Sequence, residues 1–153
     1  MRILLADDDY SQAESIKTWL EMDGYSVDWV DRGDYAIHAI EQHQYDCILL
    51  DRGLPQATGD DILKTIRTRQ QGIPVIFITA KDSAEDEAVG FEVGAVDYIV
   101  KPFSPIVVRA HVKNHLKLQQ LTNYLLDEVE RQVKQKTEAQ KKLADQEILL
   151  HQQ

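Results

Sequence analysis

Residues 46–59 read DCILLDRGLPQATG. The apolar run at 46–50 is continuous rather than alternating, which predicts a short strand that is buried on both faces. The run ends at Asp51, and the Gly-Leu-Pro segment just beyond it predicts a turn or loop. We therefore predict a buried strand with an acidic side chain at its carboxyl end.

Four more apolar runs of similar length lie at 3–6, 26–30, 75–78 and 96–100. Short buried strands separated by amphipathic helices predict an α/β fold, in which a doubly wound, five-stranded parallel sheet is covered on both faces through right-handed crossovers. The apolar residues at helical spacing between the runs are Ile16, Trp19 and Leu20; Ala36, Ile37 and Ile40; Ile62, Leu63 and Ile66; and Ala88, Val89, Phe91 and Val93.

Polar residues follow four of the five predicted strands. In a doubly wound sheet the ligand site lies beyond the carboxyl ends of the strands, so we expect these residues to converge on one pocket. They are Asp7-Asp8-Asp9 after the first strand, Asp51 after the third, Thr79-Ala80 after the fourth and Lys101-Pro102-Phe103 after the fifth.

The predicted pocket has the composition of a hard-cation site. Asp7, Asp8 and Asp51 offer carboxylate oxygens without His or Cys companions, which suits Mg²⁺, with Mn²⁺ as an alternative ion. Beside such an ion Asp51 stays ionised and can attack phosphorus to form an acyl phosphate. Lys101 and the Thr79 hydroxyl can stabilise the equatorial oxygens of the transferred phosphoryl group.

Each motif has a purely structural interpretation when it is taken alone. An Asp-rich segment commonly caps a helix or makes a turn, and Thr79 is a residue type favoured in strands. Tyr98 could belong to the core, and Lys101 could be a surface charge. Their occurrence together on successive strand ends favours the functional interpretation.

Residues 1–118 resemble response-regulator receiver domains in the order and spacing of four motifs. That resemblance implies a flavodoxin-like strand order of 2-1-3-4-5. It also implies that a histidine kinase or phosphotransfer protein phosphorylates Asp51. The matching motifs are the acidic cluster at 7–9, Asp51-x-x-Leu54-Pro55-x-x-x-Gly59, Thr79-Ala80, and Gly94-Ala95-x-Asp97-Tyr98-x-x-Lys101-Pro102-Phe103.

The resemblance further assigns roles within the site. It implies that Asp8, Asp51 and the Gly53 carbonyl ligate Mg²⁺ while Asp7 assists through water. Thr79 and Tyr98 would switch the face formed by the fourth helix, fifth strand and fifth helix. Gly53 and Lys81 would tune dephosphorylation, and the peptide bond before Pro102 would be cis.

An enzyme of another class is the main alternative. Phosphatases of the haloacid-dehalogenase type also combine a nucleophilic Asp with Mg²⁺, Thr and Lys on an α/β fold. They typically show an Asp-x-Asp pair after the first strand, whereas the spacing here fits receivers better. His111 and His115 have a zinc-compatible spacing, but the sequence suggests no third ligand for them.

Composition limits the remaining functions. The formal net charge of −9 argues against a direct nucleic-acid binder, and no apolar stretch is long enough to span a membrane, so we expect a cytoplasmic domain. The single cysteine, Cys47, excludes an internal disulfide and is predicted to be a buried core thiol.

After Ser104-Pro105 a helix is predicted to continue to the end of the chain. We assign 1–118 to the receiver and 119–153 to a helical linker that leads to an absent output domain, such as a histidine kinase or a cyclic-dinucleotide enzyme. A parallel coiled-coil homodimer is preferred over a single solvated helix. Its heptad positions are Leu118, Leu125, Gln132, Ala139 and Gln146, with Thr122, Val129, Lys136, Leu143 and Leu150, of which six are apolar.

Overall fold

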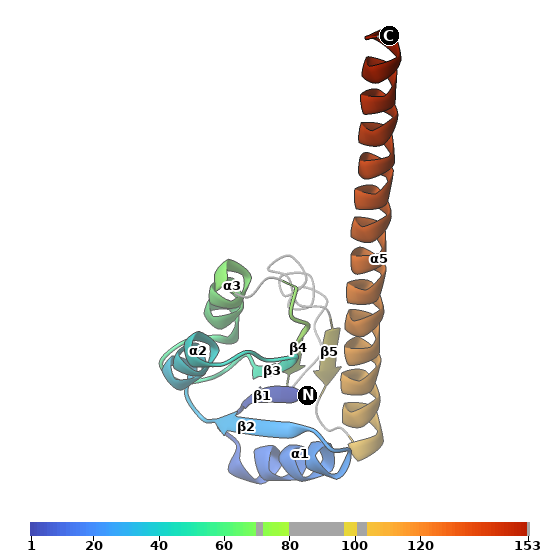
Figure 1. The fold of residues 1–153 in the computed structure, drawn as a ribbon. Helices are drawn as coiled ribbons and strands as arrows, with labels where there is room; N and C mark the ends of the chain where they lie inside the picture. The colour runs from blue at the N-terminus through green and yellow to red at the C-terminus, as the bar shows by residue number, and fades with distance from the viewer. Residues whose placement is uncertain (70–71, 80–96, 101–103, 153) are drawn as a thin grey trace. The chain divides into compact units, whose positions relative to one another are not determined.

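The computed structural model describes residues 1–69, 72–79, 97–100 and 104–152. Strands and helices alternate as predicted over residues 2–79, and a strand is again followed by a helix over residues 97–151; Figure 1 shows the elements in order from blue to red. The predicted helix around Ala88 to Val93 lies outside the described residues. The elements are β1 (Arg2–Ala6), α1 (Tyr10–Met22), β2 (Ser26–Val30), α2 (Gly33–Gln42), β3 (Cys47–Asp51), α3 (Gly59–Arg69), β4 (Val75–Thr79), β5 (Asp97–Val100) and α5 (Pro105–His151).

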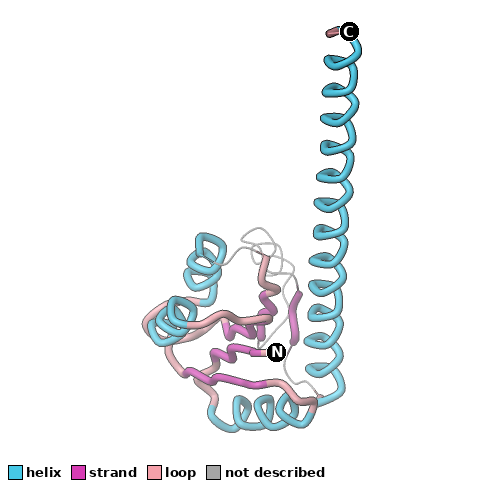
Figure 2. The backbone as a smooth tube through the Cα atoms, viewed as in Figure 1, coloured by secondary structure: helices cyan, strands magenta, loops and turns pink. Residues whose placement is uncertain are grey.

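The five strands form one sheet in the order β2-β1-β3-β4-β5, and every neighbouring pair is parallel. Figure 2 shows the strands in magenta. Leu5 lies beside Trp29 of β2 on one side and Leu49 of β3 on the other. This confirms the predicted doubly wound sheet and its strand order. Because all strands are parallel, their carboxyl ends lie along the same edge.

Alternate residues of β1, β3 and β4 supply two hydrophobic cores, one on each face of the sheet. Leu4, Leu50 and Phe77 pack with the buried residues of α2 and α3, on the side where Figure 1 shows those two helices. Leu49 and Ile76 pack in the other core with the buried residues of α1 and the start of α5. Burial on both faces explains why the strands are continuous apolar runs.

Two glycines allow the loop after β3 to lie against its neighbours. A Cβ on Gly59 would stand 2.8 Å from the Arg52 Cα, and the Gly59 N–H donates to the Arg52 carbonyl at 3.1 Å. A Cβ on Gly33 would stand 2.4 Å from the Ala57 carbonyl oxygen, and the Gly33 N–H donates to the Pro55 carbonyl at 2.9 Å. Any side chain at either position would displace the loop.

The chain consists of two compact units, Met1–Lys117 and Leu118–Gln153, so α5 contributes to both. We call residues 105–117 the proximal stretch of α5 and residues 118–151 the distal stretch. Val108, Val112 and Leu116 of the proximal stretch are buried, whereas no described residue of the distal stretch is. The domain limits at 118 and 119 stay a prediction. Among the described helices, none is long and apolar enough to cross a membrane.

Candidate metal and phosphoacceptor site

Three carboxylates converge at the carboxyl edge of the sheet. One oxygen each from Asp7, Asp8 and Asp51 lies within 4.8 Å of the others. Asp7 and Asp8 directly follow β1, and Asp51 ends the adjacent parallel strand β3. Asp7 is fully buried and Asp51 is 9% exposed, while Asp8 is open to solvent. The structure therefore brings together the three predicted acidic residues.

Hydrogen bonds hold Asp7 in place from several directions. Its Oδ1 accepts from the Asp9 backbone N–H at 3.0 Å, and its Oδ2 accepts from the side-chain amide of Gln12. The Asp7 N–H donates to the Val30 carbonyl at 3.0 Å, and the Trp29 indole N–H donates to the Asp7 carbonyl at 2.9 Å. A buried carboxylate needs donors, and these come from the N-cap and the first turn of α1, while β2 binds the backbone of Asp7.

Asp9 has a different role from its two neighbours. Its Oδ1 accepts from the Gln12 backbone N–H at 3.1 Å, and its carbonyl accepts from the Ala13 N–H at 2.9 Å. These contacts make Asp9 the N-cap of α1. The helix-cap interpretation of the acidic segment is thus correct for Asp9.

The acceptor candidate Asp51 is oriented by the backbone of the loop that follows it. Its Oδ1 accepts from the Gly53 N–H at 3.0 Å. A Cβ on Gly53 would lie 3.7 Å from that oxygen, an ordinary contact that leaves room for a side chain. The Arg52 guanidinium pairs with Asp60 at 3.1 Å and lies 5.0 Å from the centre of the Phe77 ring. Arg52 is thereby anchored to α3 and β4.

The other predicted site residues are described only in part. Thr79 is the half-buried last residue of β4, and its neighbour Ile78 lies beside Asp51 in the sheet. The backbone of Tyr98 belongs to β5, but its side chain lies outside the described part of the structure. Lys81 and Lys101 also lie outside the described residues, as does the peptide bond before Pro102.

The acidic cluster fits a hard divalent cation. Its three donors are all carboxylate oxygens, the ligand type that Mg²⁺ prefers, and two of them belong to side chains with little or no exposure. Like charges gathered in a poorly solvated site repel each other unless a cation offsets them. The residues present are therefore compatible with a bound metal ion.

His111 and His115 have an acidic partner that was not predicted. Asp97 Oδ2 lies 2.9 Å from His115 Nε2 and also contacts His111 Nδ1. The expectation that no third metal ligand accompanies the two histidines stays a prediction. Asp97 begins β5 and α5 packs back along that strand, which is a relation between segments rather than a local motif. Among the described residues, the acidic and histidine ligand atoms that converge within 4.8 Å remain those of the three aspartates.

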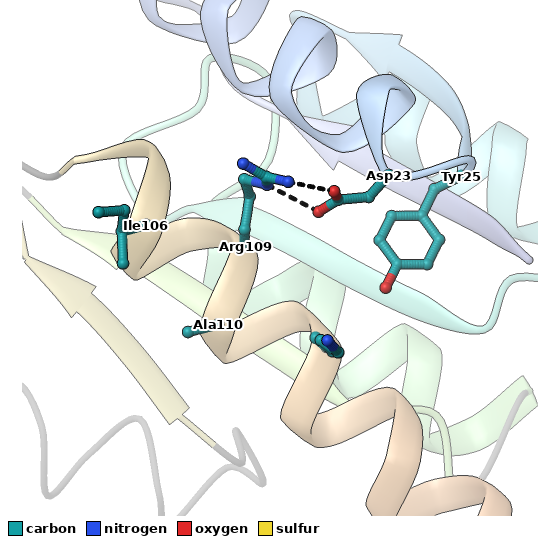
Figure 3. Close-up of a pocket in the computed structure, with 6 residues that line it drawn as sticks. Asp23, Tyr25, Ile106, Arg109 and Ala110 are labelled. Atoms are coloured by element: carbon teal, nitrogen blue, oxygen red, sulfur yellow. Dashed lines mark hydrogen bonds and ion pairs between the residues drawn. The ribbon is translucent and has the colours of Figure 1, made fainter.

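A second polar feature joins α1 to the proximal stretch of α5 (Figure 3). Arg109 donates to both carboxylate oxygens of Asp23, with Nε at 2.8 Å from Oδ2. The hydrogen bond from Arg109 lowers the pKa of the Asp23 carboxyl. These two residues line a hollow of about 360 Å³ with Tyr25, Ile106, Ala110 and Lys113.

Comparison with known proteins identifies the family. The family model of the response regulator receiver domain matches residues 3–113. The chain belongs to this family. The receiver is 42% identical over 113 residues to the transcriptional regulatory protein QseB of Escherichia coli O157:H7. The aligned residues cover 74% of this chain and 52% of QseB. Response regulator protein PmrA of Pseudomonas aeruginosa is 39% identical over 113 residues, covering 74% of this chain and 51% of that one.

Solved structures agree with this assignment. The receiver domain of Francisella response regulator 1452 has a TM-score of 0.72 and 34% identity, covering 76% of this chain and 96% of that one. The receiver domain of the sensor histidine kinase PA1611 from Pseudomonas aeruginosa PAO1, which has a magnesium ion coordinated in its active-site cleft, has a TM-score of 0.70 and 30% identity. The aligned residues cover 76% of this chain and 97% of the PA1611 domain.

These findings confirm that the receiver is a two-component signalling domain, and the phosphatase alternative finds no support in them. The chain spans about half the length of the curated relatives QseB and PmrA. The expectation that it contacts no nucleic acid is also unsupported, because QseB is named as a transcriptional regulatory protein. The cytoplasmic location stays a prediction.

Proposed function

We propose that Asp51 accepts a phosphoryl group from the phosphohistidine of a kinase or phosphotransfer protein. The observation that supports this most is the convergence of Asp7, Asp8 and Asp51 at one edge of the sheet. An Asp51 carboxylate oxygen attacks phosphorus, and the new O–P bond forms as the P–N bond to the donor histidine breaks. The electron pair of the broken bond stays on the imidazole nitrogen, and the phosphoryl group continues as an acyl phosphate.

Asp8, Asp51 and the Gly53 carbonyl are the proposed ligands of Mg²⁺ or Mn²⁺, with Asp7 acting through water. When bound there, the ion would screen the attacking carboxylate from the phosphoryl oxygens. Asp51 presents one oxygen that the Gly53 N–H orients, and the buried Asp7 adds negative charge behind it. The magnesium ion in the PA1611 receiver domain supports this choice of metal.

The remaining roles are proposals drawn from the family. Thr79 ends β4 at the same sheet edge, and its hydroxyl donates a hydrogen bond to the phosphoryl group. Lys101 supplies positive charge. Tyr98 then changes position together with Thr79 and alters the surface near β5 and α5. Gly53 and Lys81 tune the lifetime of the acyl phosphate.

Acetyl phosphate tests the acceptor assignment. We expect the protein to gain one phosphoryl mass in the presence of Mg²⁺ and none with EDTA, as measured by rapid intact-mass spectrometry. Asp51→Asn should abolish the gain, whereas Asp61→Asn, which alters an exposed carboxylate of α3, should leave it unchanged. An unmodified protein under conditions that modify a known receiver, or an Asp51→Asn variant that is still modified, contradicts the proposal.

We also propose that the distal stretch of α5 pairs with a second copy of itself. Leu118, Leu125, Val129, Leu143 and Leu150 occupy the heptad positions, and each is more than half exposed in the single chain. Burying this apolar stripe against an identical one would remove it from water. Leu125→Asp combined with Leu143→Asp should raise the dimer dissociation constant at least about tenfold in sedimentation equilibrium. Thr137→Asp, outside the heptad positions, should not, and equal effects would contradict the pairing.

Phosphorylation of Asp51 is proposed to control an output module joined through α5. The name of QseB supports transcriptional regulation as the output, and the name of PA1611 supports a histidine kinase. Determining the coding sequence beyond Gln153 distinguishes the two classes. A reading frame that contains neither module contradicts this part of the proposal.

A further inference from the structure

The first turn of α1 contains a hydrogen bond that has no role in the chemistry proposed above. Gln12 is the third residue of α1, and at many helix starts the third side chain returns to the N–H of the capping residue. Here the N–H of the cap, Asp9, donates to Asp7 Oδ1 at 3.0 Å instead. The Gln12 side chain extends to Asp7 Oδ2. Gln12 therefore contacts the acidic cluster rather than completing the cap.

The orientation of this contact follows from its chemistry. An ionised carboxylate only accepts hydrogen bonds, so the NH₂ group of Gln12, and not its carbonyl, faces Asp7. The Asp7 carboxylate accepts at both oxygens, from a backbone N–H at Oδ1 and from the amide at Oδ2. Donors on both oxygens restrict rotation of the carboxylate plane.

We propose that Gln12 is a positioning residue for the divalent cation, because its amide holds the Asp7 carboxylate in the orientation that the metal site requires. This inference rests on the proposed cation site at Asp7, Asp8 and Asp51. Gln12 is half-buried at the edge of that site, so it can act on Asp7 without being a ligand. A neutral amide also orients the carboxylate without adding a positive charge that would repel the cation.

The two common hard cations should respond differently to the loss of this contact. Mg²⁺ demands near-ideal octahedral geometry, whereas Ca²⁺ accepts irregular arrangements of oxygen ligands. Gln12→Met removes the donor and keeps the length of the side chain. If Gln12 positions Asp7, this variant should weaken Mg²⁺ binding about tenfold, as expected for a lost hydrogen bond to a charged group. Ca²⁺ binding should weaken by less than about threefold.

Trp29 offers a reporter beside the site, because its indole donates to the Asp7 carbonyl at 2.9 Å. In a Trp19→Phe background of the full chain, Trp29 is the remaining tryptophan. Titrations of its emission with MgCl₂ and with CaCl₂ give both dissociation constants, and thermal melting at each ion concentration gives a second readout. Gln42→Met, an exposed position at the end of α2, is the matched control and should change neither constant.

The outcomes separate the possible failures. Equal weakening of Mg²⁺ and Ca²⁺ by Gln12→Met means a merely structural role and overturns the inference, as does no weakening at all. If Mg²⁺ changes neither the Trp29 emission nor the melting temperature of the parent protein, the proposed cation site itself is wrong. If Gln12→Met does not fold, Gln12→Leu also removes the donor and should weaken Mg²⁺ binding more than Ca²⁺ binding. Equal weakening of the two ions by Gln12→Leu, or no weakening, overturns the inference.

Discussion

The proximal and distal stretches of α5 belong to one continuous helix but differ in their surroundings. Val108, Val112 and Leu116, each four residues apart, are at most 4% exposed in the core that α1 shares. In the distal stretch, Leu125 is 52% exposed and Val129 is 57% exposed. Packing on the sheet therefore fixes the proximal helix, whereas the distal one depends on its own hydrogen bonds, on side-chain pairs along its surface and on any partner.

This difference shows how little helical periodicity says about burial. Both stretches repeat apolar residues at intervals of three or four, so each could form a buried face. Only the proximal stretch contributes residues to the hydrophobic core on the α1 face of the sheet. The same spacing of apolar residues therefore contributes differently to stability in the two stretches, and substitutions can measure the difference.

The largest contrast is expected when a charge is placed in each stretch. Val112→Asp buries an unpaired carboxylate and should lower the free energy of unfolding by more than about 3 kcal/mol, or prevent folding. Tyr124→Asp should change it by less than about 0.5 kcal/mol, because this side chain of the distal stretch already meets water and lies outside the heptad positions. Urea unfolding followed by circular dichroism measures both. Similar losses for the two variants would show that the stretches do not differ in packing.

Thiol reactivity extends the comparison to the core. Cys47 is buried, and burial raises the pKa of its thiol to about 12, so it should react with a disulfide reagent only when the fold opens. A thiol introduced by Gln135→Cys in the distal stretch should react at least about 100-fold faster at neutral pH. Stopped-flow absorbance with the parent chain as control gives both rates. Comparable rates would mean that the core opens far more readily than its packing indicates.

Shortening the chain tests whether the two units are independent. A chain that ends at Lys117 keeps Val108, Val112 and Leu116, and its free energy of unfolding should lie within about 1 kcal/mol of the parent value. A chain that ends at Ser104 loses all three and should not fold. Chemical denaturation of the first and circular dichroism of the second decide the matter. A marked loss of stability in the chain that ends at Lys117 would show that the distal stretch stabilises the receiver.

The smallest effect is expected for an exposed ion pair. The hydrogen bond from Arg109 holds the pKa of Asp23 below its ordinary value in the folded state. The resulting stabilisation is present above the ordinary carboxyl pKa and is lost as the pH falls through the lowered value. Arg109→Gln should therefore reduce Tm slightly at neutral pH and not at all in strong acid. Arg131→Gln, which breaks the pair with Glu128 in the distal stretch, is the control and should leave Tm unchanged.

Periodicity and strand ends were sufficient to predict the sheet and the acidic cluster. Predicted strand limits agree with the observed ones within one residue, for example 26–30 for β2 and 75–78 for β4. Asp7, Asp8 and Asp51 could be predicted because residues that follow neighbouring parallel strands must meet at one edge. These features depend on local patterns and one topological rule.

The contacts that were not predicted join segments far apart in the chain. The bond from Trp29 to the Asp7 carbonyl and the contact of Asp97 with His115 depend on how side chains align across the sheet. Tyr45 is only 4% exposed, and its hydroxyl donates to Asp28 at 2.7 Å. This partner allows the polar end of the ring to be buried in the core. Such contacts depend on how distant segments pack together. A single sequence contains no local pattern that predicts them.

The glycines around the loop after β3 divide it into fixed and adjustable positions. Gly33 and Gly59 have backbone atoms of neighbouring segments where a Cβ would stand, whereas a Cβ on Gly53 would make only an ordinary contact with Asp51 Oδ1. In a library of all single substitutions selected for phosphorylation, positions 33 and 59 should retain glycine almost exclusively, while position 53 should accept many residues. Among these three glycines, position 53 is therefore the one at which the loop that orients Asp51 can gain a side chain without displacing its neighbours.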